Sequence, residues 1–207
     1  MADARNARIV EISAAGGVLR TLDVAALPDN TRLCDPHDVR AVGADRLLIV
    51  DAASNLVMIC DWFGQVLRLI GGDGEMRLSD PHSAQLLENG DLLIADSGNS
   101  RIVRVGESGA IVAEFETFVA DGRQLRLAKP RYAEVAPDGT LVVADSDNNR
   151  VLAANAGGEL QWELDRIPDS PIPILRQPRW VQAIGCDEVV VSDHLHHRIL
   201  HLRRLAG

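Results

Sequence analysis

Hydrophobic and polar positions alternate along this chain in short segments separated by polar turns. Residues 92–96 read LLIAD, an unbroken apolar run that ends in aspartate, and residues 101–105 read RIVRV, where apolar and polar positions alternate. The turn ENGD precedes the first segment, and SGNS joins the two. Short runs of this kind, bounded by glycine, asparagine and serine, predict β-strands joined by tight turns. Long segments of helical periodicity are absent, which excludes alternating βαβ folds.

One phrase is present in five copies. ADSGNSRIVRV at residues 95–105 has counterparts at 2–12, 50–60, 144–154 and 192–202. Two residue types mark the copies: Asp3, Asp51, Asp96, Asp145 and Asp193, and the prolines Pro36, Pro81, Pro130 and Pro178. Both markers recur every 45 to 49 residues and keep the same unequal spacing. Two independent markers in step indicate a structural repeat.

Each repeat holds four predicted antiparallel strands, which in one repeat read PHSAQLL, LLIAD, RIVRV and AIVAEFE. The run LLIAD fits a strand that is covered on both faces. Four strands in a repeat of this length are typical of a β-propeller blade. We therefore predict an all-β protein, a single β-propeller domain of four-stranded blades. Its expected blade parts are 1–28, 29–73, 74–122, 123–170 and 171–207.

The phrase NGDLLIADSGNSRIVRV resembles the blades of NHL-repeat propellers, which carry such an Asp-turn-Asn-x-Arg core. PHSAQLLENGDLLIADSGNSRIVRV, together with GAIVAEFE and GELQWEL, is also similar to arylsulfotransferase-like propellers. The resemblance covers almost the entire chain. It implies the fold rather than one activity, because such blades serve binding modules, lyases and transferases alike.

The expected number of blades, four to five, depends on the two ends of the chain. RIVEI at 8–12 and GVLRTL at 17–22 read as a third and a fourth strand, whereas RILHL at 198–202 reads as a third strand without a fourth. GVLRTL could complete the last blade and close a four-blade ring, which removes exposed sheet edges. The alternative is an open arc of about five blades, a piece of a larger propeller or half of a homo-oligomer joined through its incomplete blades. We favour the arc, because the ring leaves RIVEI without a place.

An arginine follows the repeated aspartate by five residues in four copies: Asp3/Arg8, Asp96/Arg101, Asp145/Arg150 and Asp193/Arg198. In the second copy Leu56 replaces the arginine. A group needed in every blade is better explained by structure than by catalysis. We predict partly buried ion pairs that bind blade to blade, with further bonds to turn amides. Asn99 and Asn148 are interpreted as turn residues.

The positions directly after the anchor prolines differ between blades and are candidates for function: His37, His82, Arg131 and Arg179. The first strand of a propeller blade is innermost, so its start lies at the mouth of the central channel. The turn between the second and third strands opens on the same face. In the last copy this turn carries His194, His196 and His197 where other copies have serine or asparagine.

Two histidines and two arginines around a channel mouth suit sulfate, phosphate or a carboxylate. Arginine offers a planar fork of donors, and histidine can bind, move a proton or act as a nucleophile. We predict a binding module for a small anionic ligand or a protein or peptide partner, with site residues His37, His82, Arg131, Arg179, His194 and His196. The alternative is an arylsulfotransferase-like or lyase-like enzyme with His82 and His37 as catalytic candidates. A third interpretation is a channel lined by hydrated polar groups without a ligand.

The resemblance adds a role for the histidines, since arylsulfotransferase-like propellers use channel histidines and an arginine for sulfuryl transfer. Peptidylglycine-lyase-like propellers hold zinc with channel histidines. Zinc sites generally have at least three protein ligands, and only His37 and His82 occupy ring positions, so we expect no metal or other cofactor. A zinc ion would require His194, His196 or His197 as well. Tyr132 and Trp180 follow the ring arginines and suit either ligand stacking or core packing.

The composition, 46% hydrophobic and 25% charged, is ordinary for a globular chain. The net charge of −9 disfavours nucleic acid and anionic membranes, and the arginines at 123, 126, 131, 176 and 179 form only a modest cluster. No run long enough for a membrane span and no signal peptide is evident, which predicts a cytoplasmic protein, although a mature secreted fragment would look similar. Cys34, Cys60 and Cys186 fit neither a disulfide framework nor a cysteine zinc site.

Overall fold

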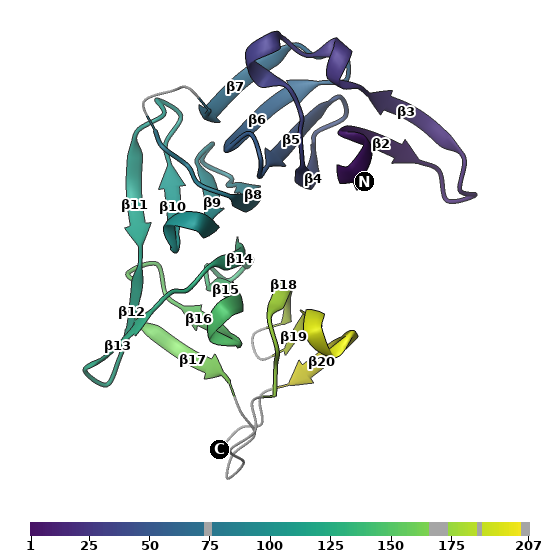
Figure 1. Cartoon of the computed structure of the whole chain (residues 1–207). Helices are drawn as coiled ribbons and strands as arrows, with labels where there is room; N and C mark the ends of the chain where they lie inside the picture. The colour runs from purple at the N-terminus through teal and green to yellow at the C-terminus, as the bar shows by residue number, and fades with distance from the viewer. Residues whose placement is uncertain (73–75, 166–173, 186–187, 204–207) are drawn as a thin grey trace.

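The structure is a computed structural model that describes residues 1–72, 76–165, 174–185 and 188–203. Regular secondary structure within these ranges consists of β-strands and short 3-10 helices. The strands form five small antiparallel sheets that follow one another around a common axis, a five-blade β-propeller (Figure 1). This confirms the all-β propeller predicted from the repeats. No helix in the described ranges is long and apolar enough to cross a membrane.

Each of the five sheets is one blade, numbered I to V along the chain. Blade I contains β1 (Ala2–Asp3), β2 (Arg8–Ile12) and β3 (Val18–Leu22). Blade II contains β4 (Pro36–Val42), β5 (Arg46–Asp51), β6 (Leu56–Asp61) and β7 (Val66–Gly71). Blade III contains β8 (Pro81–Leu86), β9 (Leu92–Asp96), β10 (Arg101–Val105) and β11 (Ile111–Phe115). Blade IV contains β14 (Pro130–Val135), β15 (Leu141–Asp145), β16 (Arg150–Ala154) and β17 (Leu160–Leu164). Blade V contains β18 (Pro178–Gly185), β19 (Glu188–Asp193) and β20 (Arg198–Arg203).

A hairpin that the repeat did not predict lies between blades III and IV. It consists of β12 (Thr117–Ala120) and β13 (Arg123–Arg126) and runs beside the outer strand of blade IV, where the Val119 amide donates to the Gly158 carbonyl at 3.3 Å. The expected blade boundary between residues 122 and 123 falls in the turn of this hairpin. The boundaries expected at 73/74 and 170/171, and Cys186, lie outside the described residues.

The four-blade ring is wrong, because its closing strand is already paired within blade I. β3 pairs with β2, with Ile9 opposite Leu22, and both side chains are fully buried. Residues 17–22 therefore complete their own blade and not the last one. Within the described residues no hydrogen bond joins blade I to blade V. Five blades are present, the number that the arc predicts.

The hydrophobic core lies between the blades. Each neighbouring pair of blades shares one cluster of buried apolar side chains, and for blades II and III this cluster includes Leu48, Val57, Ile94 and Val103. β9, with the sequence LLIAD, is buried at every position. Its sequence lacks a polar face because both faces of the strand lie against neighbouring blades.

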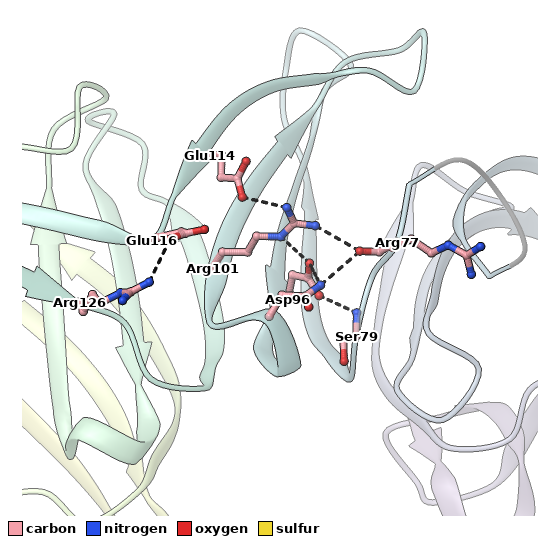
Figure 2. Close-up of polar contacts among 8 residues, drawn as sticks. Arg77, Ser79, Asp96, Arg101, Glu114, Glu116 and Arg126 are labelled. Atoms are coloured by element: carbon pink, nitrogen blue, oxygen red, sulfur yellow. Dashed lines mark hydrogen bonds and ion pairs between the residues drawn. The ribbon is translucent and has the colours of Figure 1, made fainter.

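The repeated phrase forms a 3-10 turn closed by an ion pair. In blade III, η4 (Ser97–Asn99) follows Asp96, and the Nε of Arg101 donates to Asp96 Oδ2 at 2.7 Å. Figure 2 shows this network with the amide of Ser79, which donates to Asp96 Oδ1 at 2.7 Å. The predicted ion pair is present in all four copies that carry the arginine: Arg8–Asp3, Arg101–Asp96, Arg150–Asp145 and Arg198–Asp193.

The ion pair holds one blade together and does not bind blade to blade as we expected. Arg101 Nη2 donates to the carbonyl of Arg77, which lies in the segment that leads from blade II into β8. The network therefore fixes this segment to the third strand of the same blade. The next residue of the phrase does bond to the following blade: Ser97 Oγ donates to the Pro130 carbonyl and Ser146 Oγ to the Pro178 carbonyl, both at 2.5 Å.

Candidate functional site

The positions after the four anchor prolines are β-bulges. In blade II, Pro36 pairs with Asp51 and Asp38 with Val50, so His37 between them has no partner in the ladder. The register shifts in the same way at His82, Arg131 and Arg179. A bulge bends the strand and turns the side chain of the extra residue away from the regular alternation. The repeat thus provides one redirected position per blade in blades II to V, occupied by histidine or arginine.

The four bulge residues line one cavity of about 220 Å³ together with Asp38, Tyr132 and Trp180. The structure brings His37, His82, Arg131 and Arg179 to one place, although they belong to four different blades. Their roles in binding or catalysis stay predictions. Sequence reasoning missed Asp38, for which its place directly after a ring residue was the available signal.

His82 is held in one orientation inside this cavity, with 8% of its surface exposed. Its Nδ1 lies 2.8 Å from the carbonyl oxygen of Asp80, to which only a protonated Nδ1 can donate. Nε2 then carries a lone pair and accepts a hydrogen bond from Arg131 Nη1. Burial, and after it the charges of Arg131 and His37, lower the pKa of His82 to about 4. His82 is therefore a neutral imidazole near pH 7.

His37 stands against His82 from the neighbouring blade. The two rings meet edge to face with their centroids 4.3 Å apart. His37 Nε2 lies 3.0 Å from Asp35 Oδ2. The two histidines consequently differ in environment: His82 is buried and accepts from a guanidinium, whereas His37 is exposed beside a carboxylate.

Arg131 and Arg179 supply two guanidinium groups to the cavity. Neither makes an ion pair with a carboxylate of the described residues. Burial, and next the positive charge of Arg131, lower the pKa of Arg179. Two neighbouring cations without a carboxylate partner give the cavity an unbalanced positive charge, which a bound anion can neutralise.

Two aromatic side chains form one wall of the cavity, and hydrogen bonds to the Tyr132 hydroxyl hold one of them in place. The rings of Tyr132 and Trp180 meet at an angle with their centroids 5.9 Å apart. The Tyr132 hydroxyl accepts from Arg40 Nη2 at 2.8 Å and donates to Glu134 Oε2 at 3.1 Å. Burial raises the pKa of Tyr132 to about 12, so this hydroxyl stays protonated. Tyr132 is 7% exposed and belongs to the core cluster, which confirms core packing, and it also lines the cavity, where ligand stacking stays a prediction.

The three histidines of the last turn have different surroundings. Burial, followed by the charge of Arg179, lowers the pKa of His194. His196 Nδ1 instead lies 2.8 Å from Asp193 Oδ2. Asn99 and Asn148 make the same contact with their own aspartates at 2.8 Å, so His196 takes the place of a turn asparagine. None of the three turn histidines lines the 220 Å³ cavity.

The absence of a metal stays an expectation. In the described ranges, no cluster of three or more histidine, cysteine, aspartate or glutamate side chains is placed to hold a metal ion. His37 and His82 remain the pair of imidazoles that a metal could use here.

Comparison with known proteins supports the fold. No protein-family model matches the chain, and no curated protein matches it. Among solved structures, virginiamycin B lyase from Staphylococcus aureus is similar with a TM-score of 0.61 and 16% identity, over 97% of this chain and 64% of the lyase. A catalytically inactive variant of that lyase with quinupristin gives 0.63 and 14%, over 99% of this chain and 65% of the other. A protein of unknown function from Bacteroides caccae gives 0.58 and 18%, over 80% of this chain and 62% of the other.

These likenesses establish that the chain belongs to the β-propeller class of proteins. The chain spans less than two thirds of the length of each of these structures. Identities of 14 to 18% show the fold alone. The narrower resemblance to NHL-repeat and arylsulfotransferase-like propellers stays a prediction.

Proposed function

We propose that this chain is a binding propeller whose channel-mouth cavity takes a small anion or the anionic group of a larger ligand. The observation that carries the proposal is the pair Arg131 and Arg179, which face one cavity without a carboxylate partner in the described part of the chain. The turn arginines differ, since each has its own aspartate. Arginines that the fold does not neutralise are suited to bind an external anion.

The neighbouring groups favour the same ligand. Asp38 also lines the cavity, but Arg40 Nε lies 3.2 Å from its carboxylate and offsets its charge. Arg131 donates to the neutral imidazole of His82, and a ligand anion is a stronger acceptor that can replace it. His37 lines the same cavity and adds an imidazole that can hydrogen-bond to a ligand.

The test is calorimetric titration with sulfate and with phosphate. Charge-assisted hydrogen bonds contribute about 1.5–3 kcal/mol each, so the double variant Arg131→Ala/Arg179→Ala should bind at least about a hundredfold more weakly. Arg123→Ala/Arg126→Ala removes the same charge from the hairpin and should keep the affinity. Equal affinities in the cavity variant and the hairpin variant, or no binding by the wild type, would show a hydrated channel lining without a ligand.

A second candidate function is an enzyme that uses His82. It is favoured by the neutral Nε2 lone pair of His82, which can accept a proton once Arg131 turns to the ligand. The fold is shared with virginiamycin B lyase, an enzyme, which is compatible with this candidate. The test is incubation with quinupristin and, separately, with an aryl sulfate. Turnover by the wild type that His82→Gln abolishes, with sulfate binding retained, would establish an enzyme, and no turnover leaves the binding module.

The expected partner and compartment rest on charge and composition. A protein or peptide partner would present a carboxylate to the same cavity that takes a small anion. Nucleic acid is not expected, because the five arginines considered for it are divided. Arg123 and Arg126 lie on the hairpin, Arg131 and Arg179 line the cavity, and Arg176 precedes β18. A cytoplasmic location remains the expectation from the sequence.

A further inference from the structure

The positions directly after the bulge residues also differ from blade to blade. They hold Asp38 on β4, Ser83 on β8, Tyr132 on β14 and Trp180 on β18, innermost strands that follow one another around the channel (Figure 1). Asp38, Tyr132 and Trp180 line the 220 Å³ cavity together with the bulge residues. Asp38 thus brings a carboxylate into a cavity that we propose for an anion, and this combination calls for an explanation.

Ser83 shows what this position does for the fold. Its Oγ accepts a hydrogen bond from the amide of Ala133 in the next blade at 3.1 Å. Asp38 Oδ2 accepts in the same way from the amide of Ala84 in the next blade at 3.4 Å. Ala84 and Ala133 occupy the same position of the repeat, three residues after the anchor proline. A neutral hydroxyl is therefore sufficient for the bond between blades, which does not need the charge of Asp38.

Asp38 has one oxygen that the fold does not use. Oδ2 lies 3.2 Å from Arg40 Nε and also accepts from Ala84, so two contacts fix the orientation of the carboxylate. Oδ1 accepts no hydrogen bond from the residues that the structure describes. The side chain is 23% exposed and lines the cavity. Oδ1 is therefore the oxygen that Asp38 can offer to a ligand.

His82 adds a second acceptor to the cavity. The carbonyl of Asp80 fixes the ring proton on Nδ1, so Nε2 holds the lone pair that accepts from Arg131. When Arg131 turns to a bound anion, as the proposed function allows, Nε2 becomes free to accept from the ligand. The cavity then presents two guanidinium donors, from Arg131 and Arg179, together with two groups that only accept.

Such a mixture of donors and acceptors distinguishes between oxyanions of the same shape. Sulfate and phosphate are both tetrahedral, but at about pH 7 phosphate keeps at least one O–H group, whereas sulfate keeps none. An O–H group donates to a carboxylate oxygen, and a bare anionic oxygen is repelled by it. A site that holds an acceptor for a ligand hydroxyl rejects the analogue without that hydroxyl, because the acceptor stays unpaired.

We infer that Asp38 makes the cavity selective for an oxyanion that carries its own O–H donor, with inorganic phosphate preferred over sulfate. Arg131 and Arg179 bind the anionic oxygens, and Asp38 Oδ1 accepts from the phosphate hydroxyl. The inference rests on the proposed function, since it assigns a ligand class to the same cavity. Asp38 determines which anion binds, and the two arginines provide the affinity.

The experiment measures the dissociation constants of phosphate and sulfate by calorimetric titration of the full chain at about pH 7. A fully buried acceptor discriminates by about 10,000-fold, and because Asp38 is partly exposed we expect the wild type to prefer phosphate by at least about tenfold. Asp38→Asn places an amide donor beside the ligand, so sulfate should bind about tenfold more tightly than to the wild type. Asp38→Ser copies Ser83 and keeps an acceptor for the amide of Ala84. It should lose the selectivity in the same way and serves if Asp38→Asn folds poorly.

Asp45→Asn is the matched control for charge. It removes a carboxylate from an exposed turn of the same blade, outside the cavity, and should leave the ratio of the two affinities unchanged. Methyl phosphate is a second probe, because its second pKa of about 6 leaves it without a proton at about pH 8, where phosphate keeps one. At this pH methyl phosphate should bind as weakly as sulfate.

The outcomes separate the inference from the proposed function. Equal affinities of the wild type for phosphate and sulfate would overturn the selectivity and leave the anion site in place. The same conclusion would follow if Asp38→Asn and Asp38→Ser kept the wild-type preference, or if methyl phosphate bound as tightly as phosphate at about pH 8. No binding of either anion by the wild type would overturn the proposed function and the inference with it.

Discussion

Two regions of this propeller use arginine in opposite ways. In the blade turns, Arg150 is buried and donates to Asp145, to Glu163 and to the Arg126 carbonyl. In the channel-mouth cavity, Arg131 donates to a neutral histidine, and Arg179 is exposed beside it. The turn arginines recur at a fixed place in the repeat, and their partners recur with them. The cavity arginines occupy a position where other blades have histidine.

The difference shows how a repeat protein separates structure from function. A residue that recurs has a partner that recurs, so its charge is neutralised within each blade. At the varying position, Arg131 and Arg179 have no carboxylate partner among the described residues, and for this reason we propose them as ligand-binding residues. Measurements of unfolding free energy in variants of the two regions test this separation.

The largest effect is expected for Arg150→Ala. Asp145 is fully buried, and the change leaves its carboxyl without the guanidinium that pairs with it, so the free energy of unfolding should fall by about 3 kcal/mol. The matched control is Arg8→Ala in blade I, where the side chains of Arg8 and Asp3 are 42% and 20% exposed and the loss should stay below about 1 kcal/mol. Urea unfolding measures both, and equal losses would contradict the distinction between buried and exposed pairs.

Leu56→Arg should destabilise blade II although it restores the repeated phrase. Asp51 already accepts from the amides of Cys34, Asp35 and Ser54, and Leu69 offers no carboxylate to a new arginine. The buried leucine is lost, so a loss of about 2 kcal/mol is expected. Leu56→Arg/Leu69→Glu should recover about 1 kcal/mol, and a double-mutant cycle by thermal unfolding measures the coupling. Additive losses would show that the two substituted side chains do not stabilise each other.

The stability of the cavity should depend on pH through His82. Its folded-state pKa of about 4 lies below the ordinary histidine value near 6.5, so between these values the unfolded chain takes up a proton that the folded protein does not. The unfolding free energy should therefore fall as the pH drops from about 6.5 to 4, by roughly 1–2 kcal/mol for this group. Urea unfolding at pH 7 and pH 5 should show a smaller fall in His82→Gln than in the wild type. The same fall in both proteins would assign the dependence to other groups.

The smallest changes in the free energy of unfolding are expected in two cases: where the substitution restores the residue found in the other turns, and where the side chain has no carboxylate partner. His196→Asn restores the residue of the other turns and should change the unfolding free energy by less than about 0.5 kcal/mol. Arg179→Ala should stay within the same limit, because burial and Arg131 already lower the pKa of Arg179 and disfavour its charge. A loss of several degrees in melting temperature for Arg179→Ala would mark it as structural.

Local pattern in the sequence predicted the strands, the blades and the turn pairs. LLIAD and its copies reveal strands covered on both faces, and the interval of five residues between Asp145 and Arg150 predicts an ion pair because the turn between them is short. The ring residues could be proposed because the anchor prolines fix their place. The blade-to-blade role of the pair was wrong, because the direction of Arg101 toward the Arg77 carbonyl depends on how the preceding segment crosses the third strand.

The sequence by itself determined that this protein is a repeat of short antiparallel strands with a neutralised aspartate in nearly every turn, because these features depend on neighbours a few residues apart. Only the tertiary structure decided that the ring positions are bulges and that β3 completes blade I. The contact of His82 with Arg131 joins residues 49 positions apart. Such contacts depend on the register and the packing angle of whole blades, which no short stretch of sequence encodes.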